Sequence, residues 1–248
     1  MRKIQERLFS LVLGGLVLAV MFHLAQELTV YTFSDNITTQ DGMQNGEENN
    51  AGKICIVLDA GHGGFDPGKI GVDGQKEAEI NLAIAEKVKK YLEANDVEVI
   101  MTRQGAEGLY DENASNKKVQ DMKRRIDIIE EKQPVAAVSI HQNSYIEEYV
   151  AGAQVFYYTD SKDGEVLAGL LQDALREYLD PLNHRQKKAN NSYYLLKKTE
   201  VPTVIVECGF LSNIREAGLL TTEEYQDKVA WAIHMGILQF VNKNKPFS

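Results

Sequence analysis

The chain is poor in proline and cysteine, and it has no excess of basic residues: its 248 residues include 5 prolines, 2 cysteines and 27 Lys and Arg against 36 Asp and Glu. The cysteines, Cys55 and Cys208, lie far apart in apolar runs, so they form no disulfide framework and no CxxC metal pair. We expect two buried thiols; a bridge between neighbouring strands is the alternative. The net charge of −9 argues against a nucleic-acid partner, which normally requires a basic face.

Long hydrophobic runs are also scarce, and the one that stands out lies at the N-terminus. Three basic residues precede an uncharged run over residues 8–26, whose apolar part is near the lower limit for a membrane span, about 17 residues. This order is typical of an export signal or a signal anchor. A cleavage site ending at Ala25 would place His23 where a small residue is required, which favours an uncleaved anchor in residues 1–30 over a cleaved signal peptide.

A polar segment follows this apolar run. Residues 36–52 are rich in Asn, Gly, Glu and Gln and contain few hydrophobic residues, so they cannot bury enough surface to order themselves. We expect a disordered tether over residues 31–52 and one folded domain over residues 53–243, placed outside the cytoplasm.

Within this domain, strand patterns alternate with helical patterns. Strands are expected over residues 53–59, 97–103, 135–141, 151–159, 192–197 and 202–209. Helices are expected over residues 79–95, 116–133, 164–179 and 223–241. The alternation predicts a single α/β domain with helices on both faces of its sheet, and the nearly continuous apolar strands fit a sheet that is covered on both sides.

Polar residues that can carry chemistry follow three of the predicted strands. His62 stands among glycines in "IVLDAGHGGFDPG", His141 ends "AVSIH", and Glu207 ends "TVIVE". Sites in open α/β sheets lie outside the carboxyl ends of the strands, so these residues can converge there. Glu77, just before the first long helix, belongs at the same edge.

Two histidines, one carboxylate and an open position are a catalytic zinc arrangement. His62, Glu77 and His141 are the expected ligands, with Glu79 and Asp73 as rivals of Glu77 and a structural role as the alternative for each histidine. The sequence contains no HExxH motif.

Glu207 is the expected proton-transfer group. Burying a carboxylate at the end of an apolar strand costs free energy, which suggests that this residue has a function. A buried salt bridge between Glu207 and Arg125 is the structural alternative.

Seven ordered segments together resemble the zinc-dependent N-acetylmuramoyl-L-alanine amidases of bacterial cell walls. They are "IVLDAGHGGFDPG", "KEAEINLAIAEKVKKYL", "VIMTR", "RIDIIEE", "SIHQNS", "VPTVIVECGFLSN" and "YQDKVAWAIHMGI". The resemblance implies a mixed, mostly parallel central sheet of about six strands, zinc bound by His62, Glu77 and His141, and Glu207 as the catalytic glutamate. It favours Glu77 over Glu79 because the family's ligand directly follows a basic residue, here Lys76.

The chain departs from the family at Gln142, Lys197 and Gln186, where alanine, arginine and glycine are common, and this leaves the substrate preference open. It shows no wall-binding repeat and no long helical insertion after "SIHQNS". One catalytic domain behind an N-terminal signal or anchor most resembles the germination-specific amidases of endospore formers, which act on spore-cortex peptidoglycan and prepare muramic δ-lactam. The resemblance therefore implies export to the forespore or spore envelope.

The implied substrate is the amide between N-acetylmuramic acid and the L-alanine of the stem peptide in peptidoglycan. Asn143 is placed to bind substrate or to cap a turn, and Arg125 is placed to bind a stem-peptide carboxylate or to brace Glu207. A zinc peptidase that cuts within the stem peptide and a non-catalytic cell-wall-binding protein are the alternative functions. An activating protein partner and the oligomeric state are left open.

The N-terminal pattern makes a testable prediction about location. A reporter fused after Asn50 is expected to report an extracytoplasmic position, because the basic start and the apolar run direct export. Paired alkaline phosphatase and fluorescent-protein fusions measure this. An inactive phosphatase fusion together with a fluorescent fusion in the cytoplasm would contradict both the export signal and a cell-wall substrate.

Overall fold

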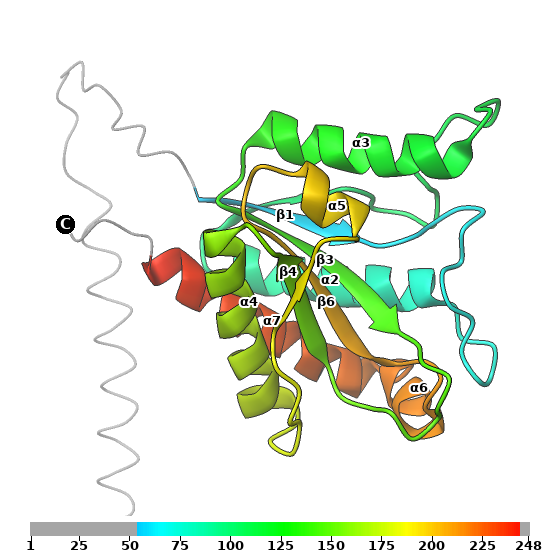
Figure 1. The fold of residues 1–248 in the computed structure, drawn as a ribbon, viewed down its shortest axis with the longest axis vertical. Coiled ribbons are helices and arrows are strands. Elements are labelled where there is room, and N and C mark those ends of the chain that lie inside the picture. The colour runs from blue at the N-terminus through cyan, green and yellow to red at the C-terminus, as the bar shows by residue number, and fades with distance from the viewer. Residues whose placement is uncertain (1–53, 244–248) are drawn as a thin grey trace, which may run out of the picture. The chain divides into compact units, whose positions relative to one another are not determined.

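The computed structural model describes residues 54–243, which form one six-stranded sheet flanked by helices (Figure 1). The strands are β1 (Cys55–Ala60), β2 (Glu98–Met101), β3 (Ala136–Asn143), β4 (Gln154–Tyr158), β5 (Lys188–Asn190) and β6 (Thr203–Phe210). Their order is β2-β1-β3-β6-β4-β5. Strands β2, β1, β3 and β6 are parallel, β4 is antiparallel to β6, and β5 is parallel to β4. The predicted single α/β domain with a mixed, mostly parallel sheet is confirmed.

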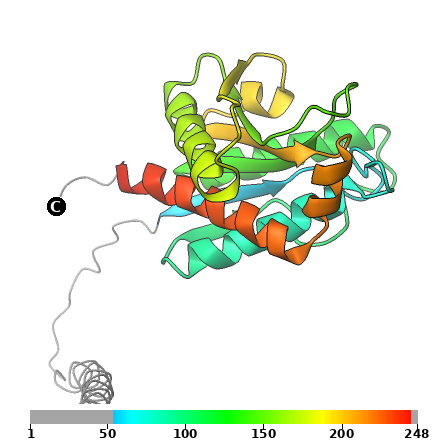
Figure 2. The same ribbon diagram turned by 90° about the horizontal axis from the view of Figure 1, so that it is seen from below.

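Helices cover both faces of this sheet. They are α2 (Glu77–Glu93), α3 (Lys117–Lys132), α4 (Lys162–Ala174), α5 (Tyr194–Lys198), α6 (Ile214–Leu220) and α7 (Glu223–Lys243), and a π-helical turn, η1 (Leu175–Leu179), extends α4. Helices α2, α4 and α7 pack together on one face, where Figure 2 shows α2 and α7 side by side. The short α5 and the amphipathic α3 lie on the other face.

The central strands β1, β3 and β6 are mostly apolar because both of their faces are buried. Leu58 and Val206 belong to the large core beneath α2, α4 and α7, whereas Val57 and Ile205 belong to smaller clusters on the α3 and α5 side. Every residue of β6 is buried. Successive strand residues thus alternate between two cores, and a strand in that position has no solvent face to carry polar residues.

One strand prediction was wrong. Residues 192–197 were expected to pair in the sheet, but Tyr194–Lys198 form α5, and the neighbouring Lys188–Asn190 form the edge strand β5. Leu195 and Leu196 are both buried: Leu195 belongs to the cluster of Val57 and Ile129, and Leu196 belongs to the cluster of Phe156 and Ile205. The two tyrosines favour a strand, but the leucines and lysines that follow are good helix formers, and packing holds the segment as a helix. Helix α6 was not anticipated.

Two other expectations concern the cysteines and the N-terminus. Cys55 and Cys208 are both free thiols, so there is no bridge; Cys208 is buried and Cys55 is half-buried. The anchor and tether expected over residues 1–52 lie outside the described residues. Within residues 54–243, no helix combines the length and the hydrophobicity that crossing a membrane requires.

A buried polar network joins the ends of β1, β2 and β3 to α3. The Asp59 carboxylate accepts hydrogen bonds from Arg125 Nη1 at 2.6 Å, from Thr102 Oγ1 at 2.7 Å and from Ser139 Oγ at 2.5 Å. Arg125 Nε also donates to Asp121 Oδ2 at 2.6 Å. Burial opposes ionisation of Asp59, but the charge of Arg125 and the hydroxyl donors outweigh it and hold its pKa at about 2. The network therefore keeps a charged pair in the core beneath the strand ends.

Breaking this network is predicted to destabilise the fold. Arg125→Met leaves the Asp59 charge buried without its partner, which costs about 3–5 kcal/mol of unfolding free energy. Arg124→Met is the matched control: Arg124 is the adjacent residue and pairs with Asp111 on the surface, so its loss costs at most about 1 kcal/mol. Urea unfolding measures both free energies. Equal losses in the two variants would show that the buried pair has no special structural role.

Candidate active site

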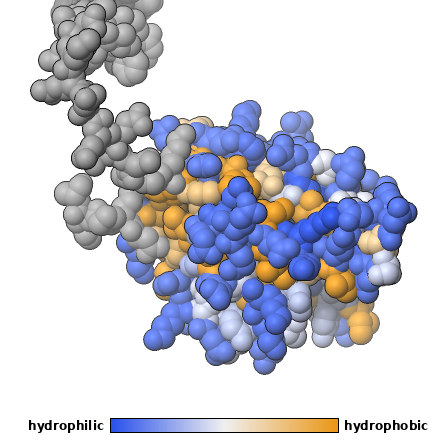
Figure 3. Space-filling model, turned by 90° about the horizontal axis from the view of Figure 1, so that it is seen from above, coloured by the Kyte–Doolittle hydropathy of each residue, from blue (hydrophilic) through white to orange (hydrophobic). Residues whose placement is uncertain are grey.

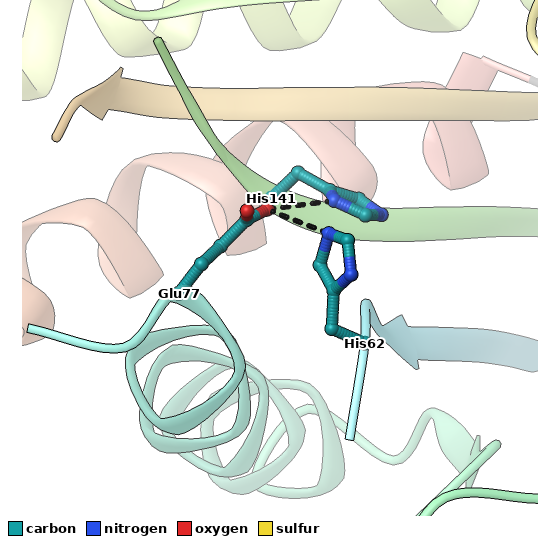
Figure 4. Close-up of side chains that lie close together, drawn as sticks. All are labelled: His62, Glu77 and His141. Atoms are coloured by element: carbon teal, nitrogen blue, oxygen red, sulfur yellow. Dashed lines mark hydrogen bonds and ion pairs between the residues drawn. The ribbon is translucent and has the colours of Figure 1, made fainter. Parts of the chain in front are cut away.

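His62, Glu77 and His141 converge at the carboxyl edge of the sheet (Figure 4). His62 follows β1, Glu77 begins α2, and His141 lies in β3. Glu77 Oε1 is 3.2 Å from His62 Nε2 and 2.9 Å from His141 Nδ1. One potential ligand atom from each side chain lies within 4.8 Å of the others, so this group can hold a metal ion.

The glycines around His62 provide room for this approach. A Cβ atom at Gly61 would lie only 2.2 Å from His141 Nε2, so any larger residue would displace that imidazole. Gly68 has a φ of +68°, and a Cβ there would lie 2.6 Å from Glu77 Oε2 and 2.7 Å from His62 Cδ2. The glycine-rich run therefore serves the close packing of the three candidate ligands.

Two arginines hold the backbone that carries His62. His62 has a φ of +63°, in the left-handed region that a non-glycine residue enters only at an energetic cost. Arg125 donates to the carbonyl oxygens of His62 at 2.6 Å and Ala60 at 2.8 Å, and Arg103 donates to those of Ala60 at 2.8 Å and Gly61 at 3.1 Å. Bonds to three consecutive carbonyls fix this turn and the direction of the imidazole.

The structure distinguishes Glu77 from its rivals. Glu77 is 3% exposed, whereas Glu79 and Asp73 are exposed, and Glu79 pairs with Lys76. Glu77 Oε2 accepts a hydrogen bond from the Lys69 amide at 2.7 Å. Burial opposes ionisation of Glu77, but its hydrogen bonds with both histidines outweigh this and lower its pKa, so an ionised carboxylate faces two imidazoles. This donor set fits zinc.

Asp66 is a partner of His62 that sequence reasoning missed. Asp66 Oδ2 lies 3.2 Å from His62 Nδ1, on the opposite side of the ring from Glu77, and 3.4 Å from Lys118 Nζ. A histidine that binds metal through Nε2 keeps its proton on Nδ1 and donates it to such a carboxylate. The signal was present in the sequence, because Asp66 lies within the same glycine-rich stretch, four residues after His62.

Glu207 lies beside this group. It is directly opposite His141 in the parallel pairing of β3 with β6. Its side chain is largely buried, and its Oε2 atom has no hydrogen-bond partner among the described residues. Burial raises the pKa of Glu207 to about 7, although the nearby histidines oppose the rise. Glu207 is thus a carboxylic acid with a near-neutral pKa and a free oxygen next to the candidate metal ligands.

The structure places Arg125 and Asn143 outside this contact group. Arg125 is 1% exposed and pairs with Asp59 and Asp121, and within residues 54–243 no ion pair joins it to Glu207. The alternative of a buried Glu207 salt bridge is therefore wrong. The Asn143 side chain accepts a hydrogen bond from the Ser144 amide at 2.7 Å, which is the turn-capping arrangement.

A cavity of about 380 Å³ opens from the histidines and Glu207 towards α3 and α5. Its far walls are mainly apolar and aromatic, formed by Met122, Tyr193, Tyr194, Leu195 and Ile205, with Lys118 at the rim. Figure 3 views the molecule from the α3 side and shows hydrophobic residues exposed between hydrophilic ones. Because only α3 and the short α5 of the described helices lie on this face of the sheet, there is room for a ligand beside Glu207.

A metal-binding group at the carboxyl edge of an α/β sheet, with a buried carboxylate beside it, is typical of metal-dependent hydrolases. Residues 56–239 match the Amidase_3 family, N-acetylmuramoyl-L-alanine amidase. The chain belongs to this family, which confirms the resemblance inferred from the sequence.

Individual relatives agree with this assignment. The chain is 35% identical to the germination-specific N-acetylmuramoyl-L-alanine amidase of Bacillus subtilis (strain 168) over 241 residues, which cover 96% of each protein. It is 40% identical to the CwlD amidase from Clostridioides difficile, solved in complex with the GerS lipoprotein, with a TM-score of 0.75 over 77% of this chain and 99% of that one. AmiC2 of Nostoc punctiforme is 31% identical, with a TM-score of 0.67 over 77% and 98% of the two chains.

The contact between Asp66 and His62 makes a prediction about metal affinity. Asp66→Asn removes the acceptor charge that orients the imidazole, so zinc affinity is expected to fall by about 10- to 100-fold, the usual effect of losing such a partner. Competition with a chromophoric chelator measures the affinity, and Asp73→Asn, which changes an exposed acid, is the control. Unchanged zinc affinity in Asp66→Asn would rule out this orienting role.

Proposed function

We propose that this chain hydrolyses the amide between N-acetylmuramic acid and L-alanine in peptidoglycan, with zinc bound by His62, Glu77 and His141 and with Glu207 as the general base. The observation that carries the proposal is the position of Glu207. It lies in register with His141, largely buried, with one oxygen that no described residue satisfies. Membership of the amidase family specifies the bond that is cut.

The residues divide the work as follows. A zinc ion in this site supplies Lewis-acid activation of water and of the scissile carbonyl group. Glu207 accepts a proton from the attacking water and delivers it to the nitrogen of the leaving L-alanine. A pKa of about 7 suits both transfers, because the group is neither a strong acid nor a strong base near neutral pH.

The supporting residues keep these groups in place. Asp66 orients His62 through Nδ1, and the amide of Lys69 orients the Glu77 carboxylate. Tyr193 and Leu195 wall the cavity beside Glu207 and limit the access of bulk water. The cavity between α3 and α5 receives part of the substrate.

The spore cortex is the proposed site of action. The basis is the likeness to the germination-specific amidase of Bacillus subtilis and to the CwlD amidase. An extracytoplasmic location, with residues 1–30 as signal or anchor and residues 31–52 as tether before the catalytic domain at 53–243, belongs to the same proposal. So does a protein partner outside the membrane, since the CwlD amidase was solved with the GerS lipoprotein.

Replacing Glu207 separates chemistry from metal binding. Glu207→Gln keeps the shape of the side chain but cannot accept a proton, so turnover should fall by about two to four orders of magnitude while zinc content and melting temperature are kept. Glu77→Gln is the informative comparison, because it is expected to lose zinc as well. Mass spectrometry of digested muropeptides, with and without chelator, measures the activity and identifies the bond that is cut.

A folded, zinc-loaded Glu207→Gln enzyme with near-normal turnover would remove Glu207 from the mechanism. Fragments cut within the stem peptide, rather than released from muramic acid, would show that the chain is a zinc peptidase.

A further inference from the structure

Gln154 lies next to Glu207 on the side away from His141. It begins β4 and is directly opposite Glu207 in the antiparallel pairing of β4 with β6. Directly opposed residues project from the same face of a sheet, with Cβ atoms about 4.5–5.5 Å apart. Phe156 and Ile205, the next opposed pair on this face, pack together towards α5. A group that is hydrogen-bonded to the Gln154 side chain therefore lies at the border of the candidate active site.

Gln154 holds Arg185. Arg185 Nη1 donates to Gln154 Oε1 at 3.1 Å, and Arg185 Nε donates to the carbonyl oxygen of Ala151 at 2.7 Å. The Arg185 Cζ atom lies 4.6 Å from the centroid of the Phe210 ring, so the guanidinium stacks on an aromatic face. Gln154 is itself fixed, because its Nε2 donates to the Gln186 carbonyl oxygen at 2.8 Å. These contacts immobilise a planar cation at the edge of the site.

Among residues 54–243, Arg185 makes side-chain hydrogen bonds to the neutral acceptors Gln154 and Ala151 and no ion pair with an Asp or Glu within 4 Å. Its remaining N–H donors make no hydrogen bond in this part of the chain, and the side chain is half-exposed. The buried Glu216 lies near enough for Arg185 to stabilise its charge, but it uses its two oxygens on the amides of Gly152 and Phe210. Arg125, by contrast, is buried and fully engaged.

An immobilised guanidinium with free donors, and with no ion pair among the described residues, is suited to bind a carboxylate through paired hydrogen bonds. We propose that Arg185 binds the α-carboxylate of the second residue of the stem peptide. This deepens the proposed amidase function and rests on it. Arg125, the candidate for a stem-peptide carboxylate in the sequence, already donates to Asp59, Asp121 and two backbone carbonyl groups.

The chemistry of the substrate supports this choice of ligand. The second residue of a peptidoglycan stem is D-glutamate joined through its side-chain carboxyl group, so its α-carboxyl group remains free. This group is one residue beyond the L-alanine whose amide is cut, and Arg185 is one side chain, Gln154, beyond Glu207. The C-terminal carboxylate of the stem has the same chemistry but lies farther from the scissile bond.

The test compares three otherwise identical muropeptides: one with free carboxylates, one with a carboxamide at the α-position of the second residue, and one with a C-terminal carboxamide. Wild type is expected to prefer the free second-residue carboxylate. Arg185→Ala should lower kcat/KM on that substrate by about 10- to 100-fold, the worth of a charge-assisted hydrogen-bond pair. It should change the rate on the second-residue carboxamide little, so the preference disappears. C-terminal amidation should not alter the effect of the mutation.

Two further variants distinguish the loss of carboxylate binding from a general loss of structure. Gln154→Glu places a competing carboxylate within reach of the same guanidinium, so it should abolish the preference while Arg185 keeps its stacking. Arg215→Ala removes an equal charge from the exposed surface of α6 and should leave the preference intact. Melting temperatures are recorded for all variants.

The ratio of the rates on the two substrates decides the question, since a general loss of activity does not change it. Equal losses on both substrates in Arg185→Ala would overturn the proposal and leave Arg185 a structural clamp. An effect that follows C-terminal amidation would overturn the choice of the second residue. If wild type cuts none of the three muropeptides at muramic acid, the proposed function itself fails.

Discussion

The backbone at the end of β1 is the constraint on which the site depends. His62 adopts a left-handed conformation, and a short polar segment cannot hold such a turn against solvent by itself. Arg125 and Arg103 hold it by donating to three consecutive carbonyl oxygens. Arg125 can be buried there because Asp59 and Asp121 neutralise it. An ion pair in the core thus sets the position of a histidine at the edge.

Glu207 is also buried, but it has few polar partners. Its neighbours along β6 are apolar because both faces of the sheet are covered. The Glu207 carboxylate is therefore surrounded mainly by hydrophobic side chains and not by cations. Asp59 and Glu207 are both largely buried carboxylates, yet their pKa values are moved to about 2 and about 7. The difference follows from partners: Arg125 and two hydroxyls stabilise the charge of Asp59, whereas Glu207 has an unpaired oxygen. One fold therefore maintains a permanent charge and a titratable acid within a short distance.

The sequence predicts the parts of the site that depend on strand ends. His62, His141 and Glu207 follow apolar strands, and parallel topology brings such positions together, so their convergence could be foreseen. The edge of the sheet could not be foreseen in the same way, because residues 192–197 combine strand-forming tyrosines with helix-forming leucines and a lysine, and packing decides for α5. The roles of Arg125 and Arg185 depend on partners distant in sequence, Asp59 and Gln154. No local sequence pattern shows which arginine uses all of its N–H donors within the fold and which keeps some of them free.

The central claim is that His62, Glu77 and His141 form one zinc site while Glu207 stays outside the coordination sphere. Crystals grown with zinc, measured on both sides of the zinc absorption edge, test this most directly. The account predicts one anomalous peak at about 2.0–2.2 Å from His62 Nε2, Glu77 Oε1 and His141 Nδ1, with the Glu207 carboxylate farther away. A peak bonded to Glu207, or zinc held by a different set of residues, would contradict it.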